Sequence, residues 1–553
     1  MKQRSLKMAA ILLFFAAGNA TAQVKNKSVV NLASPVKPKI VIGLVIDQMR
    51  WDYLYKYKDL YTEKGFKRLL SQGYSCENTM ITHLPTYTAV GHTGIYTGSY
   101  PSIHGIVGNS WFDRATGKTM YCTADSTVKG IGSNTAEGKM SPRNLFANTI
   151  TDELRLSNNF QSKVIGVCLK DRGSILPAGH SANAAYWYDD TVGKWISSSY
   201  YMNELPSWVN DFNNQQYPDK YMSGVWKTLL PIKDYTLSTK DDVPYEGKVE
   251  GEQSDTFPHQ LSLVKDKYVG FKSTPFGNTY VLDFAKKTLE NEKMGKGAVT
   301  DFLTVSLSST DYIGHFFGPN SIETEDTYLR LDKDLSGFMD YLDSVYGKNN
   351  YLLFLTADHG VANTVGYLNE HKLPAETFFY KELTKELNDS IVANFNEKNG
   401  VLKIENSQIY LNNQVFADGD YKSFVVKNYL VSLLNKKSYV SFAFDLKFIN
   451  QTVMPDAIKS IVNNSFNVGR SGDIQIIPKP ANVEGWNTNT GTTHGLWNPY
   501  DAHIPLVWYG WNIQPGKLYR EVHMSDIAST LAALLKIQMP NGAMGRVIEE
   551  VVR

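Results

Sequence analysis

Four segments of this chain end in aspartate, histidine or both, and these residue types bind metal ions. Carboxylate oxygens and neutral imidazole nitrogens are common zinc ligands, and the ends of buried strands can hold them rigidly around one point. The segments are 41–47 with Asp47, 302–315 with Asp311 and His315, 351–359 with Asp358 and His359, and the later 491–494 with His494. One such ending means little, but four of them predict a hydrolytic metal centre.

Each of these residues also has a common explanation that involves no metal. An aspartate such as Asp47 often caps the helix that follows a strand, and a single loop histidine such as His494 usually lies at the surface. Asp311 and His315 stand at i and i+4, a spacing that places both side chains on one face of a helical turn. The spacing therefore favours metal ligation for the set, although no single member establishes it.

The segment 83–109 carries several hydroxyl groups where the chain is expected to enter a helix. The N–H groups and the dipole of a helix N-terminus attract anions, and a threonine there can act as a nucleophile if a metal lowers its pKa. Local sequence leaves Thr86 and Thr88 as equal candidates, and capping is the commoner role of either. Three histidines of the segment could also bind metal, although packing or turn roles are expected for them: His83, His92 and His104.

Lys170 and Arg172 follow an expected strand at 162–169. On a phosphoryl group, arginine supplies a bidentate fork and lysine a point charge, so the pair can form a cationic clamp. The alternative is a solvated turn in which Asp171 balances the charge.

Short β-branched runs separated by helical patterns predict an α/β fold, with a mixed, mostly parallel central sheet and helices on both faces. Strands are expected at 40–47, 162–169, 299–306, 351–356 and 503–509. Helices are expected at 59–71, 85–97, 145–156, 279–291, 322–346 and 525–535. Two stretches break the alternation and are expected to be inserted cap segments: 181–268, rich in Trp, Tyr, Asn and Gly, and 373–480, with helix and strand patterns of its own.

The first 22 residues have the pattern of a secretory signal peptide: basic residues, a short apolar run and the small-residue cleavage pattern Ala20-Thr21-Ala22. A polar tail at 23–39 and a catalytic domain at 40–553 are expected to follow. The leader predicts export to the periplasm or the cell exterior. Its apolar run is too short to span a bilayer, and no other run approaches the required length.

The composition of the chain restricts the classes of partner that it is expected to bind. The chain has 56 Lys+Arg and 55 Asp+Glu, and removing the leader with its three basic residues leaves 53 against 55, a formal charge of −2. Such neutrality argues against a nucleic-acid or anionic-membrane surface. The cysteines Cys76, Cys122 and Cys168 allow one disulfide or none, and sequence alone does not choose between these alternatives.

Taken together, these segments resemble the alkaline phosphatase superfamily, and within it the phosphate-irrepressible alkaline phosphatases exported by Bacteroidetes-type bacteria. The likeness to nucleotide pyrophosphatase/phosphodiesterases is more distant. In those diesterases the nucleophilic threonine stands 21 residues before an asparagine, with TG, YP and HG landmarks between them. Thr88 and Asn109 have this spacing, with Thr97-Gly98, Tyr100-Pro101 and His104-Gly105 in place. The resemblance therefore implies that Thr88 is the nucleophile.

The same resemblance implies two zinc ions per chain. One would be held by Asp311, His315 and His494, and the other by Asp47, Asp358, His359 and Thr88. Asn109, Lys170 and Arg172 would hold the transferred group, because Lys-x-Arg marks the phosphomonoesterases and is missing from the diesterases. The sulfatase signature C-x-P-x-R is absent around all three cysteines.

These inferences predict an exported, monomeric di-zinc alkaline phosphatase that hydrolyses small phosphate monoesters through a phosphothreonine. The main alternative is a phosphodiesterase or nucleotide pyrophosphatase on the same scaffold. A second alternative is an exported binding protein that has kept metals without turnover. Ligation by His and Asp fits zinc but does not exclude other divalent ions.

Overall fold

A computed structural model describes residues 37–249, 252, 254–485 and 490–552 of the chain. The predicted signal peptide at 1–22 lies outside the described residues, as does the predicted tail up to residue 36. Lys37–Arg553 form one compact unit.

Ten strands form the central sheet, in the order β20-β2-β19-β11-β1-β10-β7-β8-β9-β6. The five middle strands, β11, β1, β10, β7 and β8, run parallel, and β19 and β9 pair antiparallel on either side of them. The strand bounds are β1 Ile40–Ile46, β2 Tyr74–Cys76, β6 Gly130–Ile131, β7 Val164–Cys168, β8 Ala184–Asp189, β9 Lys194–Ser198, β10 Asp301–Leu307, β11 Tyr351–Thr356, β19 Leu506–Gly510 and β20 Gly516–Leu518. The predicted mixed, mostly parallel sheet is confirmed.

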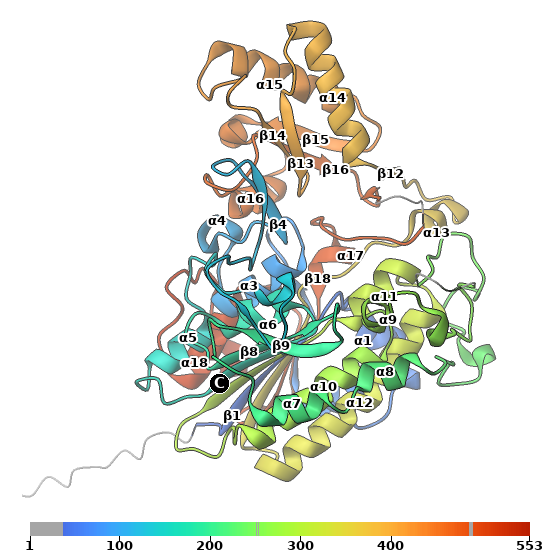
Figure 1. Ribbon diagram of the computed structural model, residues 1–553, viewed down its shortest axis with the longest axis vertical. Helices are drawn as coiled ribbons and strands as arrows, with labels where there is room; N and C mark the ends of the chain where they lie inside the picture. The colour runs from blue at the N-terminus through green and yellow to red at the C-terminus, as the bar shows by residue number, and fades with distance from the viewer. Residues whose placement is uncertain (1–36, 250–251, 253, 486–489, 553) are drawn as a thin grey trace, which may run out of the picture. The chain divides into compact units, whose positions relative to one another are not determined.

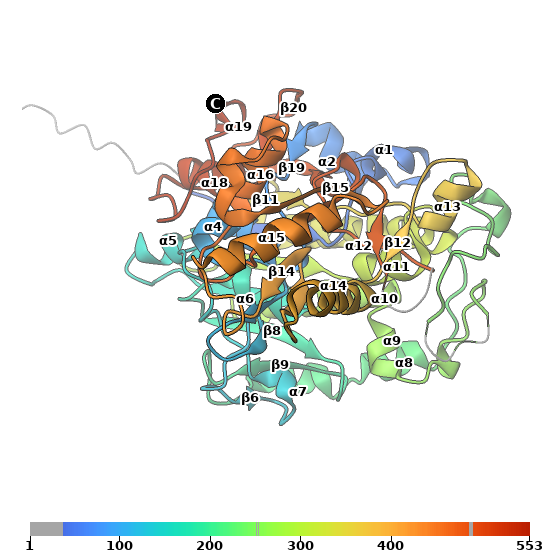
Figure 2. The same ribbon diagram turned by 90° about the horizontal axis from the view of Figure 1, so that it is seen from above.

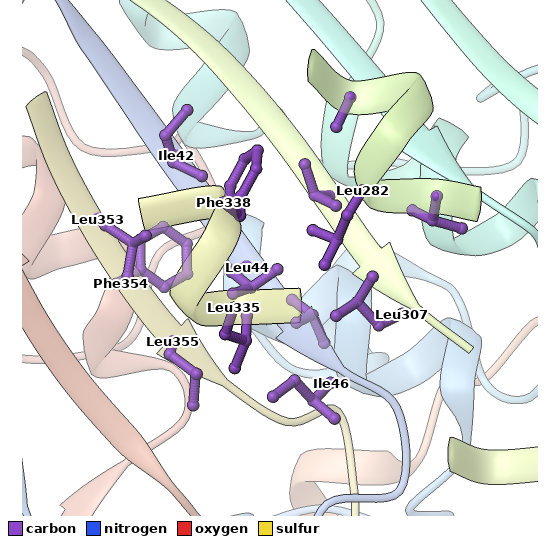
Figure 3. Packing of buried hydrophobic residues seen from close by; sticks show 14 of the residues in the cluster. Ile42, Leu44, Ile46, Leu282, Leu307, Leu335, Phe338, Leu353, Phe354 and Leu355 are labelled. Carbon is purple, nitrogen blue, oxygen red and sulfur yellow. The ribbon is translucent and has the colours of Figure 1, made fainter. Parts of the chain in front are cut away.

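Helices cover both faces of this sheet, which is why every residue of β1, β10 and β11 is buried. On one face, Figure 3 shows Leu335 and Phe338 of α12 and Leu282 of α10 packed over Ile42 and Leu44 of β1. The helices α3 and α6 lie on the opposite face (Figure 1). These four helices are α3 Thr88–Thr97, α6 Asp171–Ala178, α10 Phe276–Asn291 and α12 Ile322–Tyr346.

Gly43 of β1 allows α3 to lie close to the sheet. A Cβ added at Gly43 would come within 2.3 Å of the Tyr96 hydroxyl of α3. Because side chains alternate along a strand, Gly43 points to the face opposite Ile42 and Leu44.

Several predicted elements have different bounds in the structure. The expected helix 59–71 is a 3₁₀ turn, Lys58–Leu60, followed by α2, Phe66–Gln72. The expected helix 145–156 becomes α5, Ile150–Leu156, because Thr149 caps it through a capping box with Asp152. The expected strand 503–509 is divided into β18, His503–Ile504, and β19, since the intervening Pro505 has no N–H to donate.

The stretch 181–268 is not an insertion throughout, which corrects the sequence prediction. It begins with β8 and β9, which extend the central sheet. Trp187 and Trp195 on these strands are buried, so their aromatic richness reflects core packing rather than a covering loop. The described part of the remainder contains short helices, α7 Ser207–Asn213, α8 Tyr217–Met222 and the start of α9 Lys267–Phe271, and the 3₁₀ turns Ile232–Asp234 and Leu261–Leu263.

The stretch 373–480 forms a separate four-stranded sheet in the order β13-β14-β16-β15. Helices α14 and α15 pack on this sheet around an apolar core of their own (Figure 2). The bounds are β13 Val401–Glu405, β14 Gln408–Leu411, β15 Val440–Asp445, β16 Ile474–Pro478, α14 Tyr380–Phe395, α15 Tyr421–Leu434 and α16 Asp456–Ser465.

The three cysteines, Cys76, Cys122 and Cys168, are buried and unbonded to one another. Across the described part of the chain, no helix combines the length and apolarity that crossing a membrane requires.

Candidate metal centre

The predicted ligands lie where neighbouring central strands end. Asp47 directly follows β1, and Asp358 and His359 follow β11. Asp311 and His315 lie on α11, Ser309–Phe317, which begins just after β10. Because β11, β1 and β10 are parallel neighbours in the sheet, their carboxyl ends bring these side chains to one edge.

One group of ligand atoms consists of Asp311, His315 and His494, which lie within 4.8 Å of one another. The Nε2 atoms of His315 and His494 are 3.2 and 3.5 Å from Asp311 Oδ1. Each ring places Nδ1 beside a backbone carbonyl, 2.8 Å from Thr492 O for His315 and 2.6 Å from Thr86 O for His494. When Nδ1–H donates to a carbonyl, the Nε2 lone pair is left for a metal, which is the usual arrangement of histidine ligands.

A second group surrounds His359, whose Nδ1 lies 2.9 Å from Gly360 O. Its Nε2 is 3.5 Å from Asp47 Oδ1, from Asp358 Oδ2 and from Thr88 Oγ1. Asp47 Oδ1 and Asp358 Oδ2 are buried without a hydrogen-bond partner. Buried carboxylate oxygens are costly unless they are paired or bind a cation, so these donors fit a divalent ion.

The second group differs in membership from the predicted one. The three residues whose ligand atoms lie within 4.8 Å of one another are Asp47, Asp311 and His359. The sequence predicted Asp358 in the place of Asp311. The reason is Lys170, whose Nζ donates to Asp47 Oδ2 and Asp311 Oδ2 at 2.6 Å each and draws these carboxylates together. Asp358 Oδ2 nevertheless lies 3.5 Å from His359 Nε2.

Thr88 and Thr86 have different surroundings. Thr88 is the first residue of α3, and its Oγ1 lies 3.5 Å from His359 Nε2 and 3.4 Å from Lys170 Nζ. Thr86 instead donates its hydroxyl to Leu496 O at 2.9 Å. Of the two threonines, Thr88 therefore directs its oxygen at the ligand groups.

Asn109 and Arg172 border the same site. Asn109 Oδ1 accepts a 2.9 Å hydrogen bond from Ala89 N in the first turn of α3, which ties Asn109 to the helix that carries Thr88. Arg172 Nη1 donates to the Tyr121 hydroxyl at 3.0 Å, and this hydroxyl donates to Asp171 Oδ1 at 2.7 Å. Arg172 Nε is buried without a partner.

The solvated-turn alternative is wrong for Lys170, which is only 3% exposed. Burial opposes its charge, but the adjacent carboxylates of Asp311 and Asp47 raise the pKa of Lys170. This side chain therefore stays an ammonium group at alkaline pH.

Burial keeps two of the imidazoles neutral. It lowers the pKa of His359 to about 3 and lowers the pKa of His494 from its usual value. Burial opposes ionisation of Asp311 as well, but His315 and Lys170 hold the pKa of that carboxyl well below its usual range. Neutral imidazole and ionised carboxylate are the forms that bind metal.

Gln48 holds two of the carboxylates, and sequence reasoning missed it. Its backbone N–H donates to Asp358 Oδ1 at 3.1 Å, and its Nε2 donates to Asp311 Oδ1 at 2.7 Å. The position of Gln48 directly after Asp47, the aspartate that follows β1, could have indicated this role.

His92 and Gly91 of α3 also support the site. His92 Nδ1 lies 2.8 Å from Thr88 O and 3.2 Å from Asp358 Oδ2, and its Nε2 lies 2.8 Å from Ser306 Oγ. Both ring nitrogens are thus engaged, as expected for a packing residue. A Cβ added at Gly91 would come within 2.2 Å of Asp358 O, so glycine is required where α3 meets the end of β11. The other two histidines of the segment, His83 and His104, are buried.

Comparison with known proteins gives consistent matches over almost the whole chain. The family described as type I phosphodiesterase / nucleotide pyrophosphatase matches residues 41–497. Two relatives align over 520 residues, 93% of this chain and 95% of each relative: a "Calcium-transporting ATPase" of Myroides odoratus at 51% identity and "Alkaline phosphatase PafA" of Elizabethkingia meningoseptica at 50%. The crystal structure of wild-type PafA superimposes with a TM-score of 0.91 at 49% identity, covering 94% of this chain and 100% of that one.

Proposed function

The chain belongs to the type I phosphodiesterase / nucleotide pyrophosphatase family of the alkaline phosphatase superfamily and is an alkaline phosphatase, and we propose that it works through two zinc ions and a phosphothreonine at Thr88. The observation that carries the proposal is the position of Thr88 Oγ1, 3.5 Å from His359 Nε2 and 3.4 Å from Lys170 Nζ. Among the names of the relatives, alkaline phosphatase is the one that this chemistry supports. Because the chain is an enzyme, the alternative of a binding protein that holds metals without turnover is excluded.

Two ligand sets would hold the ions. Asp311, His315 and His494 form one set, and Asp47, Asp358 and His359 form the other. The inward Nε2 atoms and the buried Oδ1 of Asp47, which has no hydrogen-bond partner, fit divalent cations that accept nitrogen and oxygen ligands. When bound, zinc lowers the pKa of a neighbouring hydroxyl and stabilises negative charge on the phosphoryl group and on the departing oxygen.

Thr88 carries the covalent step. Its Oγ1 forms a bond to phosphorus while the bond from phosphorus to the leaving oxygen breaks, and the hydroxyl proton passes to solvent. The departing alkoxide takes up a proton from water and leaves as the alcohol. Water then cleaves the phosphothreonine, which releases phosphate and restores the threonine. The first N–H groups of α3 favour the anionic group placed there.

Asn109, Lys170 and Arg172 would stabilise charge on the transferred group. A phosphate monoester carries one more negative charge than a diester at alkaline pH. Two cations beside the nucleophile therefore favour monoesters over the phosphodiesterase or nucleotide pyrophosphatase alternative.

The test compares kcat/KM for an aryl phosphomonoester and the matching diester, in wild type, Arg172→Ala and Thr88→Ala, with metal content measured on each. We expect the monoester to be preferred, Arg172→Ala to reduce that preference, and Thr88→Ala to retain zinc while losing hydrolysis. A preference for the diester, or an unchanged monoesterase rate in Arg172→Ala, would overturn the assigned clamp. Full hydrolysis by Thr88→Ala would remove Thr88 as the nucleophile.

We also propose that the enzyme is exported to the periplasm or beyond and acts as a monomer. The support for export is the leader at 1–22, with its predicted mature start at Gln23. N-terminal sequencing of protein recovered from the periplasm or medium should begin at Gln23, and its light-scattering mass should match one chain. An intact leader on cytoplasmic protein would contradict the export.

A further inference from the structure

The hairpin of β13 and β14, in the subdomain formed by residues 373–480, contacts the chain segment that carries Asn109. Its two turn residues, Asn406 and Ser407, have φ values of 55° and 56°. Two-residue hairpin turns require this left-handed conformation, and asparagine adopts it more readily than most residues. The turn carries Asn406 into the fold rather than into solvent, since this residue is only 8% exposed.

The Asn406 amide bonds to the backbone on both sides of Asn109. Its Nδ2 donates to Ser110 O at 2.8 Å and to Val107 O at 3.5 Å. Gly108 leaves the room that this amide needs, because a Cβ added at Gly108 would come within 2.3 Å of Asn406 Nδ2. The backbone around Asn109 is thus held by a residue that lies almost 300 positions later in the chain, 296 and 299 positions from the two acceptors.

Asn109 is also held at two of its own atoms. Its backbone O accepts a hydrogen bond from Cys122 N at 2.9 Å, and its Oδ1 accepts one from Ala89 N at 2.9 Å. With Oδ1 engaged by a donor, the N–H groups on Nδ2 are the part of the Asn109 amide that can donate to a phosphoryl oxygen. A donor stabilises developing charge best when it is fixed before the reaction begins, so the backbone position of Asn109 decides how well its amide works.

We propose that Asn406 is a positioning residue for phosphoryl transfer, whose amide fixes the backbone around Asn109 and so aims Asn109 Nδ2 at the transferred group. The inference rests on the proposed function, in which Asn109 stabilises charge on that group. Loss of the Asn406 amide would let this backbone shift, and a displacement of about 1 Å can cost about a hundredfold in rate. The subdomain therefore contributes to the reaction through Asn109.

Two other asparagines of the subdomain attach it to the same part of the chain. Asn464 Nδ2 donates to Thr82 O at 2.8 Å, and Asn467 Nδ2 donates to Ser102 O at 3.2 Å. These bonds are of the same chemical type as those of Asn406, but neither acceptor is a neighbour of Asn109 in the sequence. They separate attachment of the subdomain from positioning of Asn109.

The experiment measures kcat/KM for methyl phosphate, whose poor leaving group keeps the chemical step rate-limiting, together with zinc content. Asn406→Asp keeps the size of the side chain and the turn but removes the N–H donor. Asn406→Gly removes the whole amide and keeps the turn, since glycine readily adopts positive φ. Asn467→Asp is the matched control, because it makes the same change at a bond away from Asn109. Each variant is also combined with Asn109→Ala.

We expect both Asn406 variants to lower kcat/KM by about tenfold with zinc content unchanged, and Asn467→Asp to stay within about twofold of wild type. In the Asn109→Ala background, the Asn406 substitutions should cost less than about twofold more, because residues that act through one another are not additive. A merely structural role for Asn406 would give the same loss in both backgrounds. That result would overturn the proposal, as would wild-type kcat/KM in both Asn406 variants.

Failure of the proposed function would give a different result. Asn109→Ala alone would then hydrolyse methyl phosphate as fast as wild type, which would remove the role of Asn109 and the inference with it. If the inference alone fails, Asn109→Ala is slow and the loss from Asn406→Gly is additive. Asn406→Gly introduces no charge, so it supplies the same comparison if Asn406→Asp does not fold.

Discussion

The metal centre and a second buried cluster both combine carboxylates with imidazole, but they use the imidazole in different ways. The second cluster, called the loop cluster, consists of Glu246, Glu252, Glu323 and His259. His259 places Nδ1 3.1 Å from Glu252 Oε2 and Nε2 3.2 Å from Glu323 Oε1. At the metal centre, each imidazole instead gives Nδ1 to a backbone carbonyl and turns Nε2 toward carboxylate oxygens.

The pKa values follow this difference. Burial lowers the pKa of His359 to about 3. Burial also opposes the charge of His259, but the hydrogen bonds that its ring donates to the carboxylates of Glu252 and Glu323 raise the pKa of that ring to about 9. One imidazole is therefore neutral, as a metal ligand must be, and the other is the positive half of a charged pair. Among the described residues, three-ligand groups within 4.8 Å occur at the metal centre and not in the loop cluster. The direction of Nε2 distinguishes a ligand site more clearly than the number of acids does.

Removal of the metal ions should give the largest difference between the metal centre and the loop cluster, because activity is expected to depend on the ions. Dialysis against a chelator should lower activity by about a thousandfold or more, because the ions supply both hydroxyl activation and charge stabilisation. Thr88 and the cations alone cannot replace them. Added zinc should restore the rate. Activity that persists in protein shown by metal analysis to hold less than a tenth of an ion would contradict the two-ion centre.

A matched pair of histidine substitutions should give the next largest difference. His494→Ala should lose one ion and lower kcat/KM by about a hundredfold, because it removes a direct ligand. His259→Ala should keep two ions per chain, since its ring nitrogens face Glu252 and Glu323. Metal content after gel filtration is the readout. If both variants lost zinc equally, the distinction between the two clusters would fail.

The loop cluster should make stability depend on alkaline pH. The folded pKa of His259, about 9, lies above the unfolded value of 6.5. Its contribution, roughly 3 kcal/mol from this difference, is therefore complete below pH 6.5 and lost as the pH rises through 9. Glu246 acts in the same direction, because burial and Glu323 raise its pKa to about 10.

Unfolding free energies measured from pH 6 to 10 with saturating zinc test this dependence. The fall in stability should be smaller in His259→Gln than in wild type. The exposed residue His371 provides the control His371→Gln, whose curve should follow wild type. A His259→Gln curve parallel to wild type across this range would rule out a charged His259.

Tyr121→Phe should give the smallest effect, because it changes how a cation is held and leaves the cation in place. The substitution removes the 3.0 Å hydrogen bond to Arg172 Nη1 while keeping the ring. We expect KM for a monoester to rise by about three- to tenfold with zinc content unchanged. When Tyr121→Phe is combined with Arg172→Ala, it should raise KM little beyond the value of Arg172→Ala alone, since the two residues would act as one unit. Additive losses would show that Tyr121 does not act through Arg172.

Much of the architecture could be predicted from the sequence because the central strands are continuous apolar runs. β1, β10 and β11 are buried on both faces, and this burial imposes the β-branched and aliphatic composition that identifies them. The helix α12 keeps its predicted bounds since the side chain of Ser321 caps its start by accepting a hydrogen bond from Thr324 N. The strands β8 and β9 could not be identified in the same way, because their Trp and Tyr residues lack a periodic polar face.

Sequence by itself determined the residue types at the strand ends and, through the spacing of Thr88 and Asn109, the family. These are local properties, set by apolar runs and by short intervals along the chain. Only the tertiary structure decided which atoms converge. His315 and His494 are oriented by the carbonyls of Thr492 and Thr86, residues 177 and 408 positions away in sequence. Gln48 joins Asp311 and Asp358, and Tyr121 holds Arg172, through contacts that exist only once the chain has folded. Hydrogen bonds over such separations leave no periodic pattern, so their donors and acceptors could not be paired from sequence.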